Sequence, residues 1–464
     1  MKIIRIRYAT MPAILFFLMW APLSPAQEPG ITRAVDIGSR LELMVDDVLI
    51  DRMDGLHLQL QTPRPVPMAD SPMLQAHYAT VIKDGALYRA YYRSRIPGFK
   101  GDSEDGHITC YAESADGITW RKPNLGLIEI NGSRANNVVL HESPFCHNFS
   151  PFLDVRPAKD RGKRFKAVAG MNSSGLYGFE SDDGLRWKKV QGTPVIPQRI
   201  EEFDSQNVAF WSEAERCYVC YFRAKTPKGA LQSALRTVSR AVSPDFLHWS
   251  EPVPTASNLP GEHLYTSQTH PYYRAPHIYI ALPTRLQADH GDTTDILFMT
   301  ARAGSTSYTR QFKEAFIRPG LDRDRWGNRS NYTALNVVPT GPTEMSIYHS
   351  VTGLRYVLRI DGFASARAGY AKGELLTKPL MFSGKELILN YSTSAGGGIR
   401  VEIQAAAGTP LSGFRLEDCP VIIGDEIEGR VAWKQGPNLG ALRGTPVRLR
   451  FVMTECDLFS FRFR

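Results

Sequence analysis

The sequence predicts an all-β protein, a five-bladed β-propeller followed by a C-terminal β-sandwich. Three observations support this prediction. Short apolar or alternating runs, bounded by Gly, Pro, Asn and Asp, recur along the chain, and long helical periodicity is nearly absent. A turn motif returns at nearly even spacing. The pattern of strands and turns changes near Gly373, where longer alternating runs with Gly-rich turns begin.

The repeated motif is Ser-x-Asp-Gly-x-x-Trp, with Phe in place of Gly in the third copy. Full copies occupy residues 114–120, 181–187 and 243–249, and degraded copies follow at 302–308 and 359–362. The Asp side chain can bond the backbone N–H groups of a tight turn, while the Trp packs inward. Five units of roughly 60 residues predict five blades.

Each unit is expected to hold three strands, the motif turn and a weaker outer strand. The expected strands are 77–83, 86–93, 108–114 and 127–130; 149–155, 165–170 and 176–181; 205–211, 218–223 and 235–242; 265–273, 278–283 and 295–301; and 332–338, 345–350 and 355–361. We expect residues 41–51 to supply an outer strand that closes the ring.

The domain boundary is expected near Ala371, with the propeller at 27–371 and the sandwich at 372–464. The sandwich strands are expected at 385–391, 399–404, 430–433, 447–453 and 458–463.

Residues 1–26 resemble a secretory signal. A basic start with Lys2, Arg5 and Arg7 precedes an apolar core at 11–21 and a small-residue cleavage site at 24–26. The apolar run is too short to span a membrane as a helix, and no later stretch approaches that length. We expect a secreted or periplasmic monomer; a retained N-terminal anchor is the alternative.

The chain is mildly basic, with a formal net charge of +8, and its Lys and Arg residues are scattered. We therefore predict no nucleic-acid partner and a neutral or anionic carbohydrate substrate. Export permits disulfides, and Cys419 with Cys456 is the best candidate pair. Cys217 and Cys220 lie in one apolar strand, which argues against a zinc or thioredoxin-type site.

Polar residues recur where the innermost strands of the blades begin. Carboxylates that converge at such a channel mouth suit glycoside hydrolysis, which needs one protonated and one ionised carboxyl group. The candidate catalytic residues are Asp154, Asp204 and Glu262, of which Asp204 and Glu262 would share acid and base duties. The candidate substrate-binding residues are Asn148, Gln206, His270, Arg274 and Glu344.

The motif turns and the count of five units resemble the five-bladed propeller hydrolases of the invertase and arabinanase groups. The segments 203–211, 262–276, 315–319 and 374–394 are similar to exported bacterial proteins of the glycosyl hydrolase family 32-like type. The resemblance implies that Asp154 stabilises the transition state. The Glu-Cys acid motif and the first-blade Asn-Asp-Pro motif of the invertases are missing.

Other interpretations stay open. A non-catalytic glycan-binding propeller would not need those motifs, and a purely structural surface protein would need no acid cluster. Each candidate residue also has a structural alternative, such as a turn cap for Asp154, a loop residue for Glu262 and a core histidine for His270. We predict no metal site and no cofactor, although a structural calcium ion in the channel is an open alternative.

Overall fold

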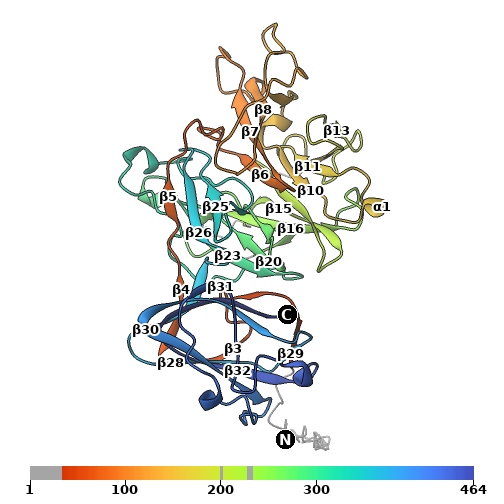
Figure 1. Cartoon of the computed structure of the whole chain (residues 1–464). Coiled ribbons are helices and arrows are strands. Elements are labelled where there is room, and N and C mark those ends of the chain that lie inside the picture. The colour runs from red at the N-terminus through yellow and green to blue at the C-terminus, as the bar shows by residue number, and fades with distance from the viewer. Residues whose placement is uncertain (1–33, 199–201, 227–233, 256) are drawn as a thin grey trace, which may run out of the picture. The chain divides into compact units, whose positions relative to one another are not determined.

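Strands and turns make up nearly all of the backbone in the computed structural model (Figure 1). The structure describes residues 34–198, 202–226, 234–255 and 257–464, so the expected signal at residues 1–26 lies outside the described residues. One α-helix occurs in the described ranges, the single turn α1 (Ala158–Arg161). The all-β prediction is confirmed.

The chain forms six small antiparallel sheets, four of four strands and two of three strands, and the strands of the two three-stranded sheets alternate along the sequence. They are β6 (Ala79–Asp84), β7 (Leu87–Arg95), β8 (His107–Ser114) and β9 (Val138–Leu140); β10 (Ser150–Leu153), β11 (Phe165–Ala169), β12 (Tyr177–Ser181) and β13 (Lys188–Lys189); β14 (Val208–Ser212), β15 (Cys217–Lys225), β16 (Arg236–Ser243) and β17 (Val253–Pro254); β18 (His263–Leu264), β21 (Thr284–Gln287) and β22 (Thr293–Ile296); β19 (His270–Tyr272), β20 (Ala275–Ala281) and β23 (Met299–Arg302); and β24 (Val338–Pro339), β25 (Glu344–Tyr348), β26 (Arg355–Arg359) and β5 (Arg64–Val66).

The first strands of these sheets pack against one another. We call β6, β10, β14, β19 and β24 the inner strands: β6 contacts β10, β10 contacts β14, β14 contacts β19, and β24 contacts β6. His270 accepts a hydrogen bond from the backbone N–H of Val337 at 3.1 Å, which links β19 to the segment before β24.

Two expectations about the outer strands are wrong. The fourth strand of the first sheet is β9, not residues 127–130. The outer strand of the last small sheet is β5, which pairs with β26, whereas residues 41–51 join a different sheet. A strand pattern predicts a strand but not its partner, because pairing depends on residues far away in sequence.

A ten-stranded sheet, which we call the C-terminal sheet, combines both ends of the described chain. It contains β1 (Val35–Gly38), β2 (Glu42–Leu43), β3 (Ile50–Asp54), β4 (Leu56–Leu60), β27 (Ala364–Ala368), β28 (Gly373–Thr377), β29 (Leu380–Phe382), β30 (Leu387–Ala405), β31 (Asp425–Arg430) and β32 (Val447–Phe463). Its buried core includes Leu389, Val401, Phe451 and Phe461.

The two longest strands of this sheet merge strands that were expected to be separate. β30 begins at Leu387 and includes the rest of the expected strand 385–391 as well as all of 399–404. β32 includes both 447–453 and 458–463. Their pairing shifts register between Thr393 and Gly398. A bulge of this kind bends a strand, so hydrogen bonding continues through the bend in a single sheet.

The motif turns form as expected. In the second copy, Asp183 Oδ1 accepts hydrogen bonds from the backbone N–H groups of Leu185 at 2.8 Å and Arg186 at 2.9 Å. Gly184 has a φ of 75°, where glycine is unstrained. The ring of Trp187 packs at 5.0 Å from that of Phe149. The first and third copies bond through Asp116 and Asp245 in the same way.

Replacing Asp183 with alanine is expected to lower the free energy of unfolding by about 1–2 kcal/mol, because two backbone donors of the turn lose their acceptor. Urea unfolding followed by tryptophan fluorescence measures the change. The matched control is Asp182→Ala in the next position, where the carboxylate makes a surface ion pair with Lys163 and the expected loss is below about 1 kcal/mol. Equal losses in the two variants would contradict the role of the turn.

The expected disulfide between Cys419 and Cys456 is wrong, because all six cysteines are free thiols. Cys419 Sγ accepts a hydrogen bond from the N–H of Val401, and Val401 pairs with Phe451 on β32. Cys456 lies farther along β32, on the order of 15 Å by strand rise.

Among the described residues, no helix has both the length and the apolar character that a membrane crossing requires.

Candidate functional site

Aromatic and charged side chains gather where the inner strands begin. We call this group the Tyr–His–Arg cluster. Its members come from the segments before the inner strands and from the adjoining ends of β7, β8, β15 and β16. They are His77, Tyr78, Arg93, His107, His147, Asp204, Arg223, Arg236, Tyr265, Arg329 and Tyr332.

Tyr332 is the centre of the aromatic contacts. Its ring lies 5.6 Å from the ring of Tyr78, 5.9 Å from that of His77 and 5.9 Å from that of Tyr265, each in an edge-to-face arrangement. Edge-to-face rings stabilise one another beyond simple burial. Segments distant in sequence are thereby held together.

The backbone is strained at two residues of the cluster and at Phe203, which precedes Asp204. His77, Phe203 and Arg329 have φ values of 59°, 67° and 61°, a region that residues other than glycine rarely adopt. Residues 77 and 78 would point in opposite directions in a regular strand, yet both rings contact Tyr332. Strain of this kind concentrates at functional sites.

Arginines cover the tyrosine faces. The guanidinium of Arg93 lies 4.8 Å from the ring centre of Tyr78, and those of Arg223 and Arg236 lie 5.7 Å and 5.0 Å from that of Tyr265. Such contacts fix a guanidinium without neutralising it. Arg223 also binds Asp204 at 2.8 Å, and the Asp204 side chain is 46% exposed.

The three histidines are held neutral. Burial, followed by the charge of Arg93, lowers the pKa of His147 to about 2. Burial and Arg93 likewise lower the pKa values of His77 and His107 to about 4. Arg93 Nη1 lies 3.4 Å from His147 Nδ1, which must therefore accept.

Some polar groups of the cluster have no partner. The Nδ1 atoms of His77 and His107 are enclosed without a hydrogen bond to the described residues. Burial raises the pKa of Tyr78 to about 12, although Arg93 opposes the shift. The cluster therefore offers neutral imidazoles, protonated phenols and guanidinium groups.

Within the described residues, no hydrogen bond or ion pair joins any two of the three predicted catalytic acids. Asp154 is buried and binds Tyr218 Oη at 2.6 Å and Arg156 at 3.0 Å. Glu262 is buried and binds both terminal nitrogens of Arg310, at 2.7 Å and 3.0 Å. Asp204 alone of the three belongs to the cluster.

Three predicted substrate-binding residues are buried and form hydrogen bonds between separate segments of the chain. Asn148 Nδ2 donates to the carbonyls of Gly170, Phe203 and Ser205, which fixes the turn that carries Asp204. Gln206 donates to Ala79 O and Thr80 Oγ1 and accepts from Gln268. Both ring nitrogens of His270 are bonded, to Gln268 O and to the N–H of Val337. Their polar atoms are thus already used inside the protein.

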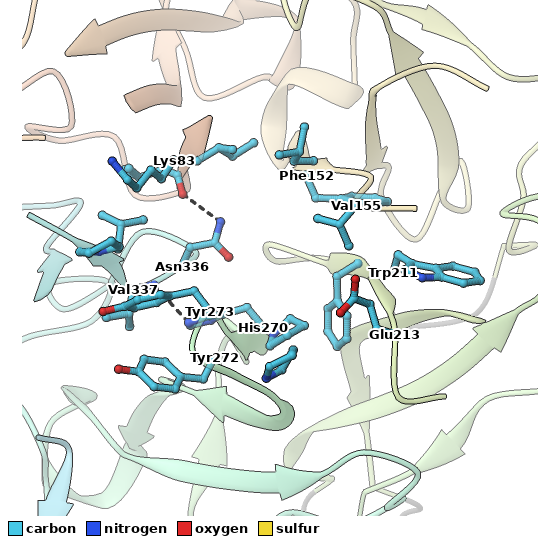
Figure 2. Close-up of a pocket in the computed structure, with 18 of the residues that line it drawn as sticks. Lys83, Phe152, Val155, Trp211, Glu213, His270, Tyr272, Tyr273, Asn336 and Val337 are labelled. Carbon is cyan, nitrogen blue, oxygen red and sulfur yellow. Dashed lines mark hydrogen bonds between the residues drawn. The ribbon is translucent and has the colours of Figure 1, made fainter. Parts of the chain in front are cut away.

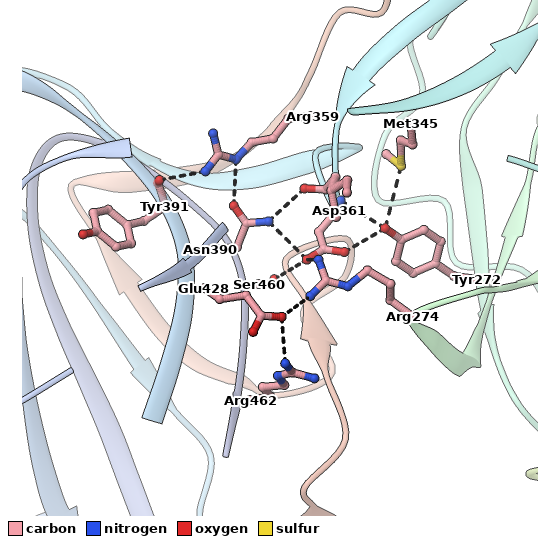
Figure 3. Close-up of polar contacts among 11 residues, drawn as sticks. Tyr272, Arg274, Met345, Arg359, Asp361, Asn390, Tyr391, Glu428, Ser460 and Arg462 are labelled. Atoms are coloured by element: carbon pink, nitrogen blue, oxygen red, sulfur yellow. Dashed lines mark hydrogen bonds and ion pairs between the residues drawn. The ribbon is translucent and has the colours of Figure 1, made fainter. Parts of the chain in front are cut away.

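The other two lie outside the cluster. Arg274 binds Asp361 at 3.2 Å and Glu428 of β31 at 2.9 Å (Figure 3). Glu344 binds Arg355 at 3.0 Å on the sheet that β5 completes.

A pocket of about 580 Å³ lies at the opposite ends of the inner strands (Figure 2). Its lining is mainly apolar and includes Val81, Phe152, Trp211, Tyr272 and Val337. The pocket carries none of the predicted acids. Nor do the described residues contain a group of three or more His, Cys, Asp or Glu side chains that could hold a metal ion.

Sequence reasoning missed most of the cluster, including Tyr78, Tyr265, Tyr332 and Arg93. Tyrosines are common in strands, so each one alone resembles a packing residue. The available signal was their recurrence just before or within the expected inner strands of three blades, together with His77 and Arg223.

No family profile matches the chain. An uncharacterised protein of Mycobacterium tuberculosis strain H37Rv is 29% identical over 133 residues, which are 29% of this chain and 40% of that protein. The chain therefore aligns with less than half the length of this curated relative.

Several of the solved structures that are similar to the chain are glycoside hydrolases. One described only as a glycoside hydrolase is 11% identical with a TM-score of 0.45, over 65% of this chain and 91% of that one. The Bombyx mori GH32 β-fructofuranosidase is 10% identical with a TM-score of 0.42, over 89% and 94% of the two chains. A thermostable family-43 glycoside hydrolase is 14% identical with a TM-score of 0.38, over 69% and 96%. At these scores the likeness carries no argument about activity.

Proposed function

We propose that the protein is an exported carbohydrate-binding β-propeller whose Tyr–His–Arg cluster binds an acidic sugar. Residues 1–26 would direct export, the small sheets would form five blades, and residues 372–464 would form the second domain together with β1 to β4 of the N-terminal segment (residues 35–60).

Backbone contacts support five blades rather than six. The two three-stranded sheets are joined by Leu282 N–H, which donates to Ser267 O, and by Leu297 N–H, which donates to Pro283 O. They can therefore be counted as one blade with an interrupted ladder. The N–H of Val81 donates to Leu335 O and that of Leu335 to Ala79 O, so the first and last blades meet.

The observation that carries the function is the composition of the cluster, which holds four arginines and three tyrosines together with the half-exposed Asp204. Arginine recognises carboxylate and sulfate groups through paired N–H donors. Tyrosine rings offer apolar faces and hydroxyls of the kind that sugar-binding sites use. The resemblance of the motif turns to those of propeller hydrolases adds the carbohydrate class.

The arrangement disfavours hydrolysis by the acids that the sequence suggested. That reaction needs two available carboxyl groups roughly 5–10 Å apart. Asp154 and Glu262 are each buried in an ion pair with an arginine. Breaking such a pair to reach a substrate costs several kcal/mol. We therefore propose recognition of the acidic group as the main task of the cluster.

Binding to uronic acid polysaccharides tests this function. Calorimetry with alginate, polygalacturonate and hyaluronan is compared with the carboxyl-reduced form of each polymer. We expect binding to at least one acidic polymer and a loss of at least about tenfold in affinity on carboxyl reduction, equivalent to ~1.4 kcal/mol.

Arg329→Gln is the matching protein variant, because Arg329 is exposed and its loss should not disturb folding. We expect about a tenfold loss of affinity. Lys434→Gln, which removes a charge from the exposed surface of the C-terminal region, should bind as the unchanged protein does. Equal affinity for the acidic and carboxyl-reduced polymers would refute the proposed function.

A further inference from the structure

We propose that the Tyr–His–Arg cluster cleaves uronic acid chains by β-elimination, with His77 as the base and Tyr78 as the acid. The inference rests on the proposed function, because it requires that an acidic sugar binds at the cluster. It adds a chemical reaction that needs no pair of free carboxylates.

The reaction is balanced within the sugar and these two side chains. The base removes the proton on C5 of the uronate, and the electrons of that C–H bond form the C4=C5 double bond. The C4–O bond breaks, and the leaving oxygen keeps its electron pair and takes a proton from the acid. Proton exchange with solvent then restores both side chains. Neither water nor an oxidant is consumed.

His77 has the properties of the base. Its ring is partly buried, and its Nδ1 is enclosed without a partner. Nε2 is not enclosed and bonds to no described residue, so Nε2 is the nitrogen that can reach a bound sugar. Burial and the charges of Arg93 and Arg329 keep the pKa of the ring near 4, so the ring is unprotonated at neutral pH. A bound uronate would offset both arginine charges, which would raise the basicity of His77 when substrate is present.

Tyr78 has the properties of the acid. With a pKa of about 12, it keeps its proton at neutral pH. No described residue bonds to its hydroxyl, and its ring contacts both the ring of Tyr332 and the guanidinium of Arg93. The strained backbone at His77 turns both side chains toward the same Tyr332 ring, so base and acid can address one bound sugar.

The arginines supply the remaining requirement. A proton next to a carboxylate becomes removable when the charge that develops on that carboxylate is neutralised. Arg93 acts electrostatically on both His77 and Tyr78. A carboxylate bound by Arg93 would therefore lie beside the two proposed reacting groups. Asp204 is already bound by Arg223 and is not needed in the reaction.

The test uses the full chain with the same three acidic polymers. Ultraviolet absorbance of the conjugated double bond is recorded, and mass spectrometry of the products separates unsaturated ends from the saturated ends that hydrolysis leaves. We expect unsaturated products from at least one polymer. Tyr78→Phe and His77→Gln should each reduce the rate by at least about 10²-fold and change the affinity much less.

Matched controls are Tyr370→Phe and His290→Gln, both at exposed positions outside the cluster, which should keep the full rate. Circular dichroism establishes that each variant is folded. If Tyr78→Phe is folded and His77→Gln is not, deuterium exchange at C5, measured with Tyr78→Phe in D₂O, reports on proton removal by His77 separately from bond cleavage. Binding without unsaturated products, or products with saturated ends, overturns β-elimination and leaves the proposed function standing. Absence of binding overturns both.

Discussion

Replacing Asp361 with alanine is expected to lower the free energy of unfolding by about 3–5 kcal/mol, because it leaves buried polar groups and a cation without their partner. The Asp361 carboxylate is fully buried. It accepts hydrogen bonds from Tyr272 Oη at 2.7 Å, Ser460 Oγ at 2.8 Å and Asn390 Nδ2 at 3.1 Å, and it pairs with Arg274 at 3.2 Å (Figure 3).

These partners come from two regions of the chain. Tyr272 ends β19 and Arg274 lies in the turn between β19 and β20, whereas Asn390 and Ser460 belong to β30 and β32 of the C-terminal sheet. One carboxylate therefore joins the two regions through four side chains. Its loss should weaken the joint more than it weakens either region alone.

Urea unfolding and scanning calorimetry measure the effect. Asp361→Asn keeps the side-chain shape and suits the φ of 62° at this position, so its smaller loss separates the charge from the backbone strain that alanine adds. Asp425→Ala is the matched control, since Asp425 binds Arg359 at an exposed position and should cost below about 1 kcal/mol. If Asp361→Ala also cost below about 1 kcal/mol, the contacts of Asp361 between the two regions would not contribute to stability.

The sequence predicted the local features of the fold well. The turn at Asp183 forms from residues within one motif, so its hydrogen bonds follow from the local chain. Most inner strands begin within a few residues of their expected starts, as β10 at Ser150 and β14 at Val208 do. Periodicity and turn chemistry are sufficient for such features.

The candidate site was predicted less well, for a physical reason. A carboxylate that binds a sugar and one that binds a distant arginine have the same local sequence. Glu262 is held by Arg310, 48 residues away, and Arg274 by Asp361, 87 residues away. Only the folded chain reveals these pairs, and the same holds for the contact of Tyr78 with Tyr332.

The N-terminal segment has a second buried ion pair network, and acid is expected to weaken it. Glu42 of β2 is fully buried and binds Arg302 of β23 at 2.5 Å, and Asp46 binds the same guanidinium at 2.8 Å. Burial alone would raise the pKa of Glu42, but hydrogen bonds and charges from His277 and Arg302 lower it to about 2.

The sign of the pH dependence follows from this shift. The folded pKa of about 2 lies below the ordinary value of 4.5, so the contribution of Glu42 to stability is complete above pH 4.5. It is lost as the pH falls from there through 2, when the folded state must also take up the proton. The contribution is on the order of 3 kcal/mol. It is lost over the same pH range as the contributions of other carboxyl groups with a lowered pKa, such as Asp183.

Glu42→Gln is therefore expected to unfold more easily in urea at pH 7 and to lose less stability than the unchanged protein between pH 4.5 and 2. Arg302→Ala should cost about 3–5 kcal/mol at pH 7, because it leaves the buried Asp46 carboxylate without its cation and removes one of the partners of Glu42. The control Asp51→Asn, at an exposed pair with Arg448, should keep the full acid dependence. If Glu42→Gln and Asp51→Asn respond to acid alike, then Glu42 is not the group that makes the attachment of the N-terminal segment sensitive to acid.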